Sequence, residues 1–468
     1  MGRYTLLQDV EVILWCCLSS WYYGYHISEL NYPEASITCS STAAGLLSTT
    51  LPPCLDIDSQ RYSAATAVFT LGGLAGSLLS SKIGEKVQAV GSIKMTGLLN
   101  IVGSLMMFAA PHWLAVLAGR IVAGVASGLA ITTVPPLLSQ ISKTSTNKVV
   151  ASHGGSIGIL NQLAIVLGIF SAQVAGLAAT GMKGDRLGGW RYVVLVSGIV
   201  AAVQLVVGQA RIGNDLMDER EKERTLRDDD EDVEQTVDRE ADLEQSEASP
   251  LLHDGDSMTP KHSESLRSLI SSPTLRPAVL LVAFILVTQQ LSGINAVLFY
   301  STPVLKNLLP NQSGLIGIFV SLINVAMTFP SLVLIDKIGR KPLLLMSLTS
   351  MAISAVLLAV GLDGHHQVLS SISIVTFVAA FALALGPVPF LLISELVPSH
   401  AVAVVSSLAL SCSWISNFVV ALTFLPLRDA LTYKDDRGAV QGEGRVFYVF
   451  LGVHVIAFLV IYSKLYRN

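Results

Sequence analysis

Side-chain amides gather in one apolar stretch of the sequence. Gln289, Gln290 and Asn295 fall within a run that is otherwise rich in Val, Leu, Ile and Ala. An amide offers both donors and an acceptor, so it suits a neutral ligand with hydroxyl groups better than a charged side chain does. An amide buried without partners is costly, so the three must either bind such a ligand or hydrogen-bond to neighbouring segments. The clustering favours the ligand, and both interpretations stay open.

The spacing of these amides predicts an interrupted helix. Residues 289 and 295 differ by six positions, which is roughly 240° around a helix at about 100° per residue. A regular helix therefore points the two amides in different directions. A break near Ser292 and Gly293 would turn both toward one site, as in the discontinuous helices of many membrane carriers.

Long apolar stretches must position these side chains. The chain has 468 residues, of which 51% are hydrophobic and 14% charged, whereas soluble domains carry about 25% charged residues. At about 20 residues per span, the sequence predicts an all-α polytopic membrane protein with 12 transmembrane helices in two six-helix halves. The expected spans are 10–28, 62–81, 93–110, 113–137, 155–179, 191–209, 276–300, 314–335, 342–361, 370–394, 401–424 and 446–463. The first is the weakest, because polar residues interrupt it.

An acidic segment separates the two halves. Between Asp215 and Glu247 there are 16 acidic and 5 basic residues, and such a block repels itself and cannot bury apolar surface. We therefore expect an N-terminal half at 1–210, a disordered linker at 211–275 and a C-terminal half at 276–468. Basic residues in the short loops place both termini and the linker in the cytosol. With a net charge of −4, the chain is not expected to bind nucleic acid.

An internal repeat supports the two halves. Lys82-Ile83-Gly84-Glu85-Lys86 recurs 255 residues later as Lys337-Ile338-Gly339-Arg340-Lys341. Two halves in the same orientation are one of the repeat plans of secondary transporters, which bind substrate between the halves. Elsewhere, Gly124 and Gly128 are spaced for close helix packing.

Several motifs in this order resemble the sugar porters of the major facilitator superfamily. They are residues 289–300 (QQLSGINAVLFY), residues 336–341 (DKIGRK), Gly386-Pro387 followed by Glu395, Gly119-Arg120, Gln162, Trp190-Arg191, and Trp414 with Asn417. The resemblance covers nearly the whole chain outside the linker. It implies a vacuolar, hexose-transporter-like member that carries a monosaccharide by alternating access, needs no cofactor and works as a monomer in the lipid bilayer.

The resemblance also implies roles for individual residues. Sugar contacts are expected from Gln162, Gln289, Gln290, Asn295, Asn324 and Asn417, with Trp414 as an apolar floor beneath the ring. Proton coupling is expected from His26 and Arg120, and conformational gating from Asp336, Gly339, Arg340, Lys341 and Glu395.

Departures from the family leave the mechanism open. His26 stands where proton-coupled members carry Asp and where facilitators carry an uncharged residue, so it is either a proton site or a neutral, hydrogen-bonded histidine. The loop motif of the first half is altered at Ser81 and Glu85, which weakens the gate on that side. Uniport and proton symport both fit, and a sugar sensor that binds without translocating is the alternative. An enzyme is not expected, because no phosphate loop, metal-spaced cluster or nucleophile with a base is visible.

Two features bear on the membrane that holds the protein. Cys39 and Cys54 share one polar loop and can pair if that loop faces an oxidising compartment. In the linker, Glu247, Leu251 and Leu252 match an acidic dileucine signal, which a sorting adaptor would read. The vacuolar or lysosomal membrane is therefore favoured, and the plasma membrane is the alternative.

Overall fold

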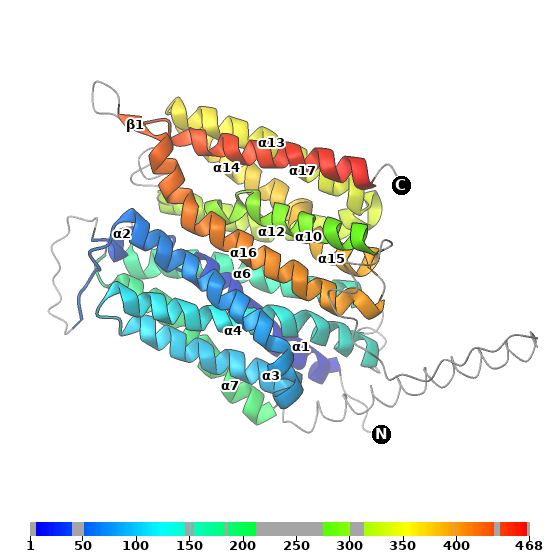
Figure 1. Ribbon diagram of the computed structural model, residues 1–468. Coiled ribbons are helices and arrows are strands. Elements are labelled where there is room, and N and C mark those ends of the chain that lie inside the picture. Colours follow the sequence, from blue (N-terminus) through cyan, green and yellow to red (C-terminus); the bar gives the residue numbers. More distant parts are fainter. Residues whose placement is uncertain are drawn as a thin grey trace, which may run out of the picture.

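The computed structural model describes residues 6–39, 51–145, 150, 154–182, 186–211, 275–299, 313–397, 399–434 and 440–465. This part of the chain is almost entirely helical (Figure 1). The N-terminal bundle comprises α1 (Leu6–Ser28), α2 (Glu34–Ile37), α3 (Ser59–Phe108), α4 (Trp113–Thr144), α6 (Gly154–Thr180) and α7 (Gly189–Arg211). The C-terminal bundle comprises α10 (Arg276–Leu291), α12 (Ser313–Ile338), α13 (Arg340–Asp363), α14 (Gln367–Ala380), the π-helix η1 (Phe381–Leu385), α15 (Val388–Leu396), α16 (Ser399–Leu431) and α17 (Val446–Leu465). An antiparallel pair, β1 (Tyr433–Lys434) and β2 (Val440–Gln441), and the 3-10 turn η2 (Glu443–Arg445) connect α16 to α17.

Eleven segments of the described residues are long and apolar enough to cross a membrane, which confirms the all-α membrane fold. The first predicted span, in α1, is not among them. That helix carries Asp9, Ser19, Ser20 and His26, which lower its hydropathy, yet all four are buried. It packs mainly against α6, so its polar face is enclosed by the rest of the bundle.

Glycines bring α3 and α4 into close contact. A Cβ on Gly124 would lie 2.1 Å from the carbonyl oxygen of Phe69, and a Cβ on Gly128 would lie 2.1 Å from that of Gly73. Only glycine allows the two backbones to approach this far. The packing role predicted for Gly124 and Gly128 is confirmed.

The two bundles lie side by side and meet along two pairs of helices, α3 with α16 and α6 with α12 (Figure 1). The start of α1 and the end of α17 lie at the same end of the molecule (Figure 1). We call this the terminal end. The opposite end carries α2 and β1, and we call it the α2 end (Figure 1).

The repeated loop motif has a different backbone in each bundle. Gly339 adopts a φ of 87° between α12 and α13, which ends one helix and starts the next. In the N-terminal bundle the equivalent Gly84 is helical, and the turn comes at Gln88, with a φ of 56° inside α3. A left-handed φ is readily adopted by glycine but strained for glutamine, so the sequence repeat does not extend to the position of the turn.

Candidate functional site

The seventh span breaks where the sequence predicts a break. Helix α10 ends at Leu291, Gly293 adopts a φ of 92°, and residues 294–299 are again helical. The hydroxyl of Ser292 donates to the backbone oxygen of Gln289 at 2.7 Å, which satisfies one carbonyl at the end of α10. Glycine is required at the break for a second reason, because a Cβ there would lie 2.7 Å from the Phe450 ring.

The break brings two amides from either side of it into contact. Asn295 Nδ2 donates to Gln290 Oε1, and Gln290 Nε2 donates to Ser413 Oγ on α16 at 2.8 Å. Both amides are buried. Hydrogen bonds between neutral groups such as these exchange readily with hydroxyls of a polar ligand, since the number of bonds is preserved.

Gln289 donates its hydrogen bonds to the backbone of the tenth span. Its Nε2 donates to the carbonyl oxygens of Leu385 and Gly386, at 2.9 and 2.8 Å. In a regular helix the Leu385 carbonyl would accept from the N–H of residue 389, but Pro389 has no N–H to donate. This part of the tenth span is also a π-helix. Gln289 therefore joins α10 to an irregular backbone, as the alternative interpretation of the amides expects.

Two further predicted amides lie buried on other helices of the C-terminal bundle. Asn324 on α12 is 3% exposed, and Asn417 on α16 is 2% exposed. Among the described residues, Asn417 Oδ1 has no hydrogen-bond partner. A buried acceptor without a partner costs about 1–3 kcal/mol, so a ligand hydroxyl at this atom would be stabilising.

Gln162 is the one predicted sugar contact on the N-terminal bundle. It lies on α6, which packs against α12 across the boundary between the bundles. The side chain is half-buried. Its helix thus faces the helix that carries Asn324, although the two side chains are not bonded to each other.

Trp414 lies at the boundary between the bundles. It projects from α16 into the N-terminal bundle, where its ring packs edge-on against Tyr23 and Phe69 with centroid distances of 5.6 and 6.3 Å. Its indole N–H donates to Ser77 Oγ on α3 at 2.8 Å. In this arrangement Trp414 is buried.

A buried charged cluster lies inside the N-terminal bundle. Arg120 NH1 contacts Glu29 Oε1 at 2.8 Å, and His26 Nδ1 lies 2.9 Å from the same oxygen in a geometry that is not a hydrogen bond. All three side chains are fully buried. His26 Nε2 is hydrogen-bonded to Asn100 Oδ1 on α3. Both predicted coupling residues therefore meet at Glu29, which sequence reasoning missed.

The surroundings of Arg120 explain how the cation is held. Its guanidinium lies over the Phe69 ring, 4.4 Å from the centroid, and it also donates to the backbone oxygen of His26 at 2.7 Å. The second carboxylate oxygen of Glu29, Oε2, has no hydrogen-bond partner among the described residues. One available signal was the spacing of His26 and Glu29, which lie three positions apart at the end of a helix.

The gating residues are placed only in part. Arg340 NH1 donates to the Ile335 backbone oxygen at 3.3 Å, and Lys341 is exposed at the start of α13. The side chains of Asp336 and Glu395 lie outside the described part of the chain, as do Glu247, Leu251 and Leu252 of the linker. These assignments stay predictions.

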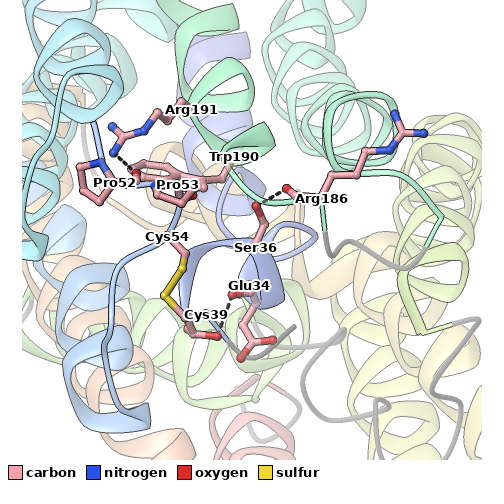
Figure 2. The surroundings of a disulfide bond; sticks show 10 residues. Glu34, Ser36, Cys39, Pro52, Pro53, Cys54, Arg186, Trp190 and Arg191 are labelled. Carbon is pink, nitrogen blue, oxygen red and sulfur yellow. Dashed lines mark hydrogen bonds between the residues drawn. A yellow bond between two sulfur atoms is a disulfide. The ribbon is translucent and has the colours of Figure 1, made fainter. Parts of the chain in front are cut away.

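A disulfide joins Cys39 to Cys54 at the α2 end (Figure 2). The segment that carries it, which we call the clasp segment (described residues 29–39 and 51–58), is bound to the loop before α7 and to the start of that helix. Trp190 Nε1 donates to the Pro53 oxygen at 3.1 Å, and Arg191 donates to the Pro52 oxygen at 2.8 Å (Figure 2). Pairing of the two cysteines settles the alternative that the sequence left open.

Further contacts close the clasp segment. Ser36 Oγ donates to the Arg186 oxygen at 2.6 Å (Figure 2), and the hydroxyl of buried Tyr32 donates to the Gly181 oxygen at 3.2 Å. Burial raises the pKa of Tyr32 to about 12, so its hydroxyl remains a donor between about pH 5 and 8. The segment begins with Glu29, so it is continuous with the charged cluster.

Comparisons with known proteins agree with this architecture. Residues 12–467 match the model of the family described as "Sugar (and other) transporter". The Saccharomyces cerevisiae "Probable metabolite transport protein" is 28% identical over 473 residues, covering 96% of this chain and 90% of that protein. The facilitated glucose transporter member 2 of solute carrier family 2 from Gallus gallus is 28% identical over 441 residues, covering 90% of this chain and 76% of that protein. The crystal structure of a D-xylose–proton symporter is similar with a TM-score of 0.70 and 20% identity, covering 97% of each chain.

Proposed function

Since the chain belongs to the sugar (and other) transporter family, we propose that it moves a monosaccharide, a hexose, across a membrane by alternating access. A protein of this family is a transporter and not an enzyme. The two six-helix halves, 1–210 and 276–468, rock about a site between them, and the linker 211–275 connects them on the cytosolic side. The terminal end faces the cytosol in this proposal.

The observation that carries the proposal is the cluster of buried amides around the break at Gly293. Gln290 and Asn295 meet across the break, and Asn417 on the neighbouring α16 has an amide oxygen without a partner among the described residues. Neutral donors and acceptors gathered in this way suit sugar hydroxyls. Sugar contacts are proposed for Gln162, Gln289, Gln290, Asn295, Asn324 and Asn417, with Trp414 beneath the ring.

The charged cluster favours proton-linked transport over uniport. A buried carboxylate shared by Arg120 and His26 binds one proton at the cost of weakening an ion pair, which makes protonation and conformation interdependent. Glu29 is the proposed acceptor, because its carboxylate lies against both Arg120 and His26. The solved relative named a proton symporter is consistent with this choice.

Uptake by purified protein in liposomes tests the function. We expect labelled hexose to enter vesicles, and to enter faster when an inward proton gradient is imposed. Protein that binds hexose in detergent but moves none in liposomes would favour the sensor, and protein that neither binds nor moves any hexose would contradict the proposal. The D-xylose–proton symporter, reconstituted in parallel with xylose, controls for vesicle quality.

The proposed location is the vacuolar or lysosomal membrane. The disulfide at the α2 end fits an oxidising lumen or exterior, opposite the cytosolic linker. The acidic dileucine sequence ending in Leu251 and Leu252 is the proposed signal, read by a sorting adaptor.

A further inference from the structure

We propose that Gly73 and Ser77 of α3 form a seat that holds Trp414 across the boundary between the bundles, and that sugar competes with this seat for the Trp414 ring. The proposal rests on the proposed transport of a monosaccharide. It assigns positioning roles to two residues of the N-terminal bundle, which act on the sugar site through a side chain of the other bundle.

The hydrogen bond at the seat has a defined direction. Ser77 Oγ donates its proton to the Gly128 backbone oxygen at 3.3 Å and accepts the indole N–H of Trp414 at 2.8 Å. Because the proton of Ser77 is used on α4, its lone pair faces the indole. A hydroxyl in this state accepts from a tryptophan, which has a donor and no acceptor.

Gly73 provides the space that the ring occupies. A Cβ on Gly73 would lie 2.5 Å from ring carbons of Trp414, closer than any real contact allows. Its neighbours Gly72 and Gly76 serve a different contact, because a Cβ on either would lie 2.2 Å from a backbone oxygen of α4. Among these three glycines, Gly73 is the one that faces the other bundle.

The seated ring has no face left for a sugar. Trp414 is 4% exposed, with the backbone of Gly73 against its ring carbons and the rings of Tyr23 and Phe69 packed at steep angles to it. A pyranose stacks on a tryptophan only where a ring face is open. Stacking on Trp414 therefore requires the ring to leave the seat or the bundles to separate there.

A second side-chain hydrogen bond joins α3 to α16. Near the α2 end, Ser59 Oγ donates to Asp429 Oδ2 at 3.3 Å. The two hydrogen bonds lie 18 positions apart on α3, or about 27 Å at about 1.5 Å per residue. The inner one involves Trp414, a proposed sugar contact, so in this proposal it is coupled directly to substrate.

Competition predicts that loosening the seat tightens sugar binding. When a binding-competent state is only partly populated, the apparent Kd rises in inverse proportion to that population. A hydrogen bond between neutral groups is worth enough to change a population about two- to tenfold. We therefore expect Ser77→Ala to lower the hexose Kd by about two- to tenfold in detergent-purified, full-length protein, measured by calorimetry. Gly73→Ala, which fills the seat, should lower the Kd at least as much.

Matched control variants separate the loss of the contact with Trp414 from general effects of a substitution in a helix. Ser80→Ala removes a hydroxyl one turn further along α3 that bonds only within its own helix, and Gly452→Ala adds a methyl where nothing lies within 4 Å. Neither should change the Kd. In the Trp414→Phe background, which lacks the indole N–H, Ser77→Ala should have no further effect, because interacting residues are not additive.

Either an unchanged or a raised hexose Kd in folded Ser77→Ala protein would overturn the proposal. If Gly73→Ala fails to fold, the hexose Kd of Ser77→Ala alone tests the proposal. If wild-type protein binds no hexose, the proposed function fails instead. The contact between Ser77 and Trp414 is then tested by fluorescence. The emission of Trp414 is obtained by subtracting the emission of Trp414→Phe protein from that of wild-type protein, and Ser77→Ala must alter this emission in the absence of sugar.

Discussion

At the scale of residues, the proposed proton coupling depends on the arrangement of charge inside the N-terminal bundle. Arg120 is buried with Glu29 as its countercharge, and an isolated cation at this depth would be far too costly. His26 stands beside the pair and adds a second group that can hold a proton. Three titratable side chains thus share one buried location, and adding one proton changes the charge of the cluster from neutral to positive when His26 is neutral.

Replacing Glu29 by Gln tests the proton acceptor. The variant keeps the side-chain shape but cannot bind a proton, so hexose should equilibrate across liposomes without accumulating under an inward proton gradient. Breaking a buried ion pair costs about 3–5 kcal/mol, so thermal stability should also fall. The measurement is uptake with and without the gradient. Asp56→Asn removes an exposed charge from the clasp segment and should behave as wild type. Gradient-driven accumulation by Glu29→Gln would contradict the assignment.

The pH dependence of hexose uptake tests the role of His26 in proton coupling. Asn at this position is uncharged at any pH and keeps a polar side chain. If His26 takes part in coupling, the rise in uptake between about pH 8 and pH 5 should flatten in His26→Asn, while exchange of hexose at equal concentrations continues. Identical profiles in wild type and variant would leave His26 as a neutral, hydrogen-bonded residue.

At the scale of elements, breaks in helices determine which groups are available to a ligand. The break at Gly293 turns Asn295 toward Gln290, and the irregular backbone before Pro387 presents carbonyls to Gln289. Both breaks lie within predicted spans, where backbone groups without partners are expensive. Neighbouring side chains satisfy them here, so the helices remain stable while interrupted.

Gly293→Ala should remove the break or strain it. A left-handed residue with a Cβ costs about 1–2 kcal/mol, and this Cβ would also overlap the Phe450 ring. We expect lower thermal stability and a hexose Kd raised at least tenfold, since Asn295 would turn away from Gln290. Gly452→Ala, in open space on α17, is the control. Unaltered binding by a folded Gly293→Ala variant would show that the break does not shape the site.

The clasp segment offers a test of the α2 end. Cys39 and Cys54 are 15 positions apart, and a disulfide closing a loop of this length stabilises by about 3 kcal/mol in the chain-entropy model. Changing both to Ser should lower the unfolding temperature, and a reducing agent should do the same to wild-type protein but not to this double variant. Cys412→Ser removes an unpaired cysteine and serves as the control. Equal stability of all three proteins would argue against the bond.

At the scale of the whole molecule, the proposed alternating access requires the boundary between the bundles to open and close while each bundle keeps its shape. Within the N-terminal bundle, α3 and α4 are locked by backbone contact at Gly124 and Gly128. The α3–α16 contact between the bundles instead uses side chains such as Trp414 and Ser77. Side-chain contacts of this kind can be made and broken without unfolding a helix, which suits a moving boundary.

In the proposed sorting to the vacuole, the dileucine sequence of the linker determines the membrane to which the protein is sent. Replacing Leu251 and Leu252 by Ala should move a fluorescently tagged protein from the vacuolar membrane to the cell surface, because the adaptor would lose the apolar part of its signal. Replacing Leu266 and Leu269, two leucines of the same linker outside that motif, should leave the location unchanged. A vacuolar location for both variants would count against the signal.

Local patterns in the sequence determined much of this protein. The apolar spans, the glycine contact of α3 with α4, and the break at Gly293 were all predictable, because hydropathy and the conformational range of glycine act over a few residues. The pairing of Cys39 with Cys54 was limited to two alternatives for the same reason, since both lie in one short loop.

The partners of buried polar groups were decided only by the tertiary structure. Glu29 and Arg120 are 91 positions apart, and Trp414 and Ser77 are 337 apart. Such contacts depend on how helices pack and rotate against one another, which spacing within one helix does not specify. Glu29 lies just beyond the end of α1, and nothing local to it says that its carboxylate is buried against an arginine of α4. Likewise, sequence assigned Trp414 to the sugar, and only the packing of α16 on α3 revealed the seat that its ring occupies.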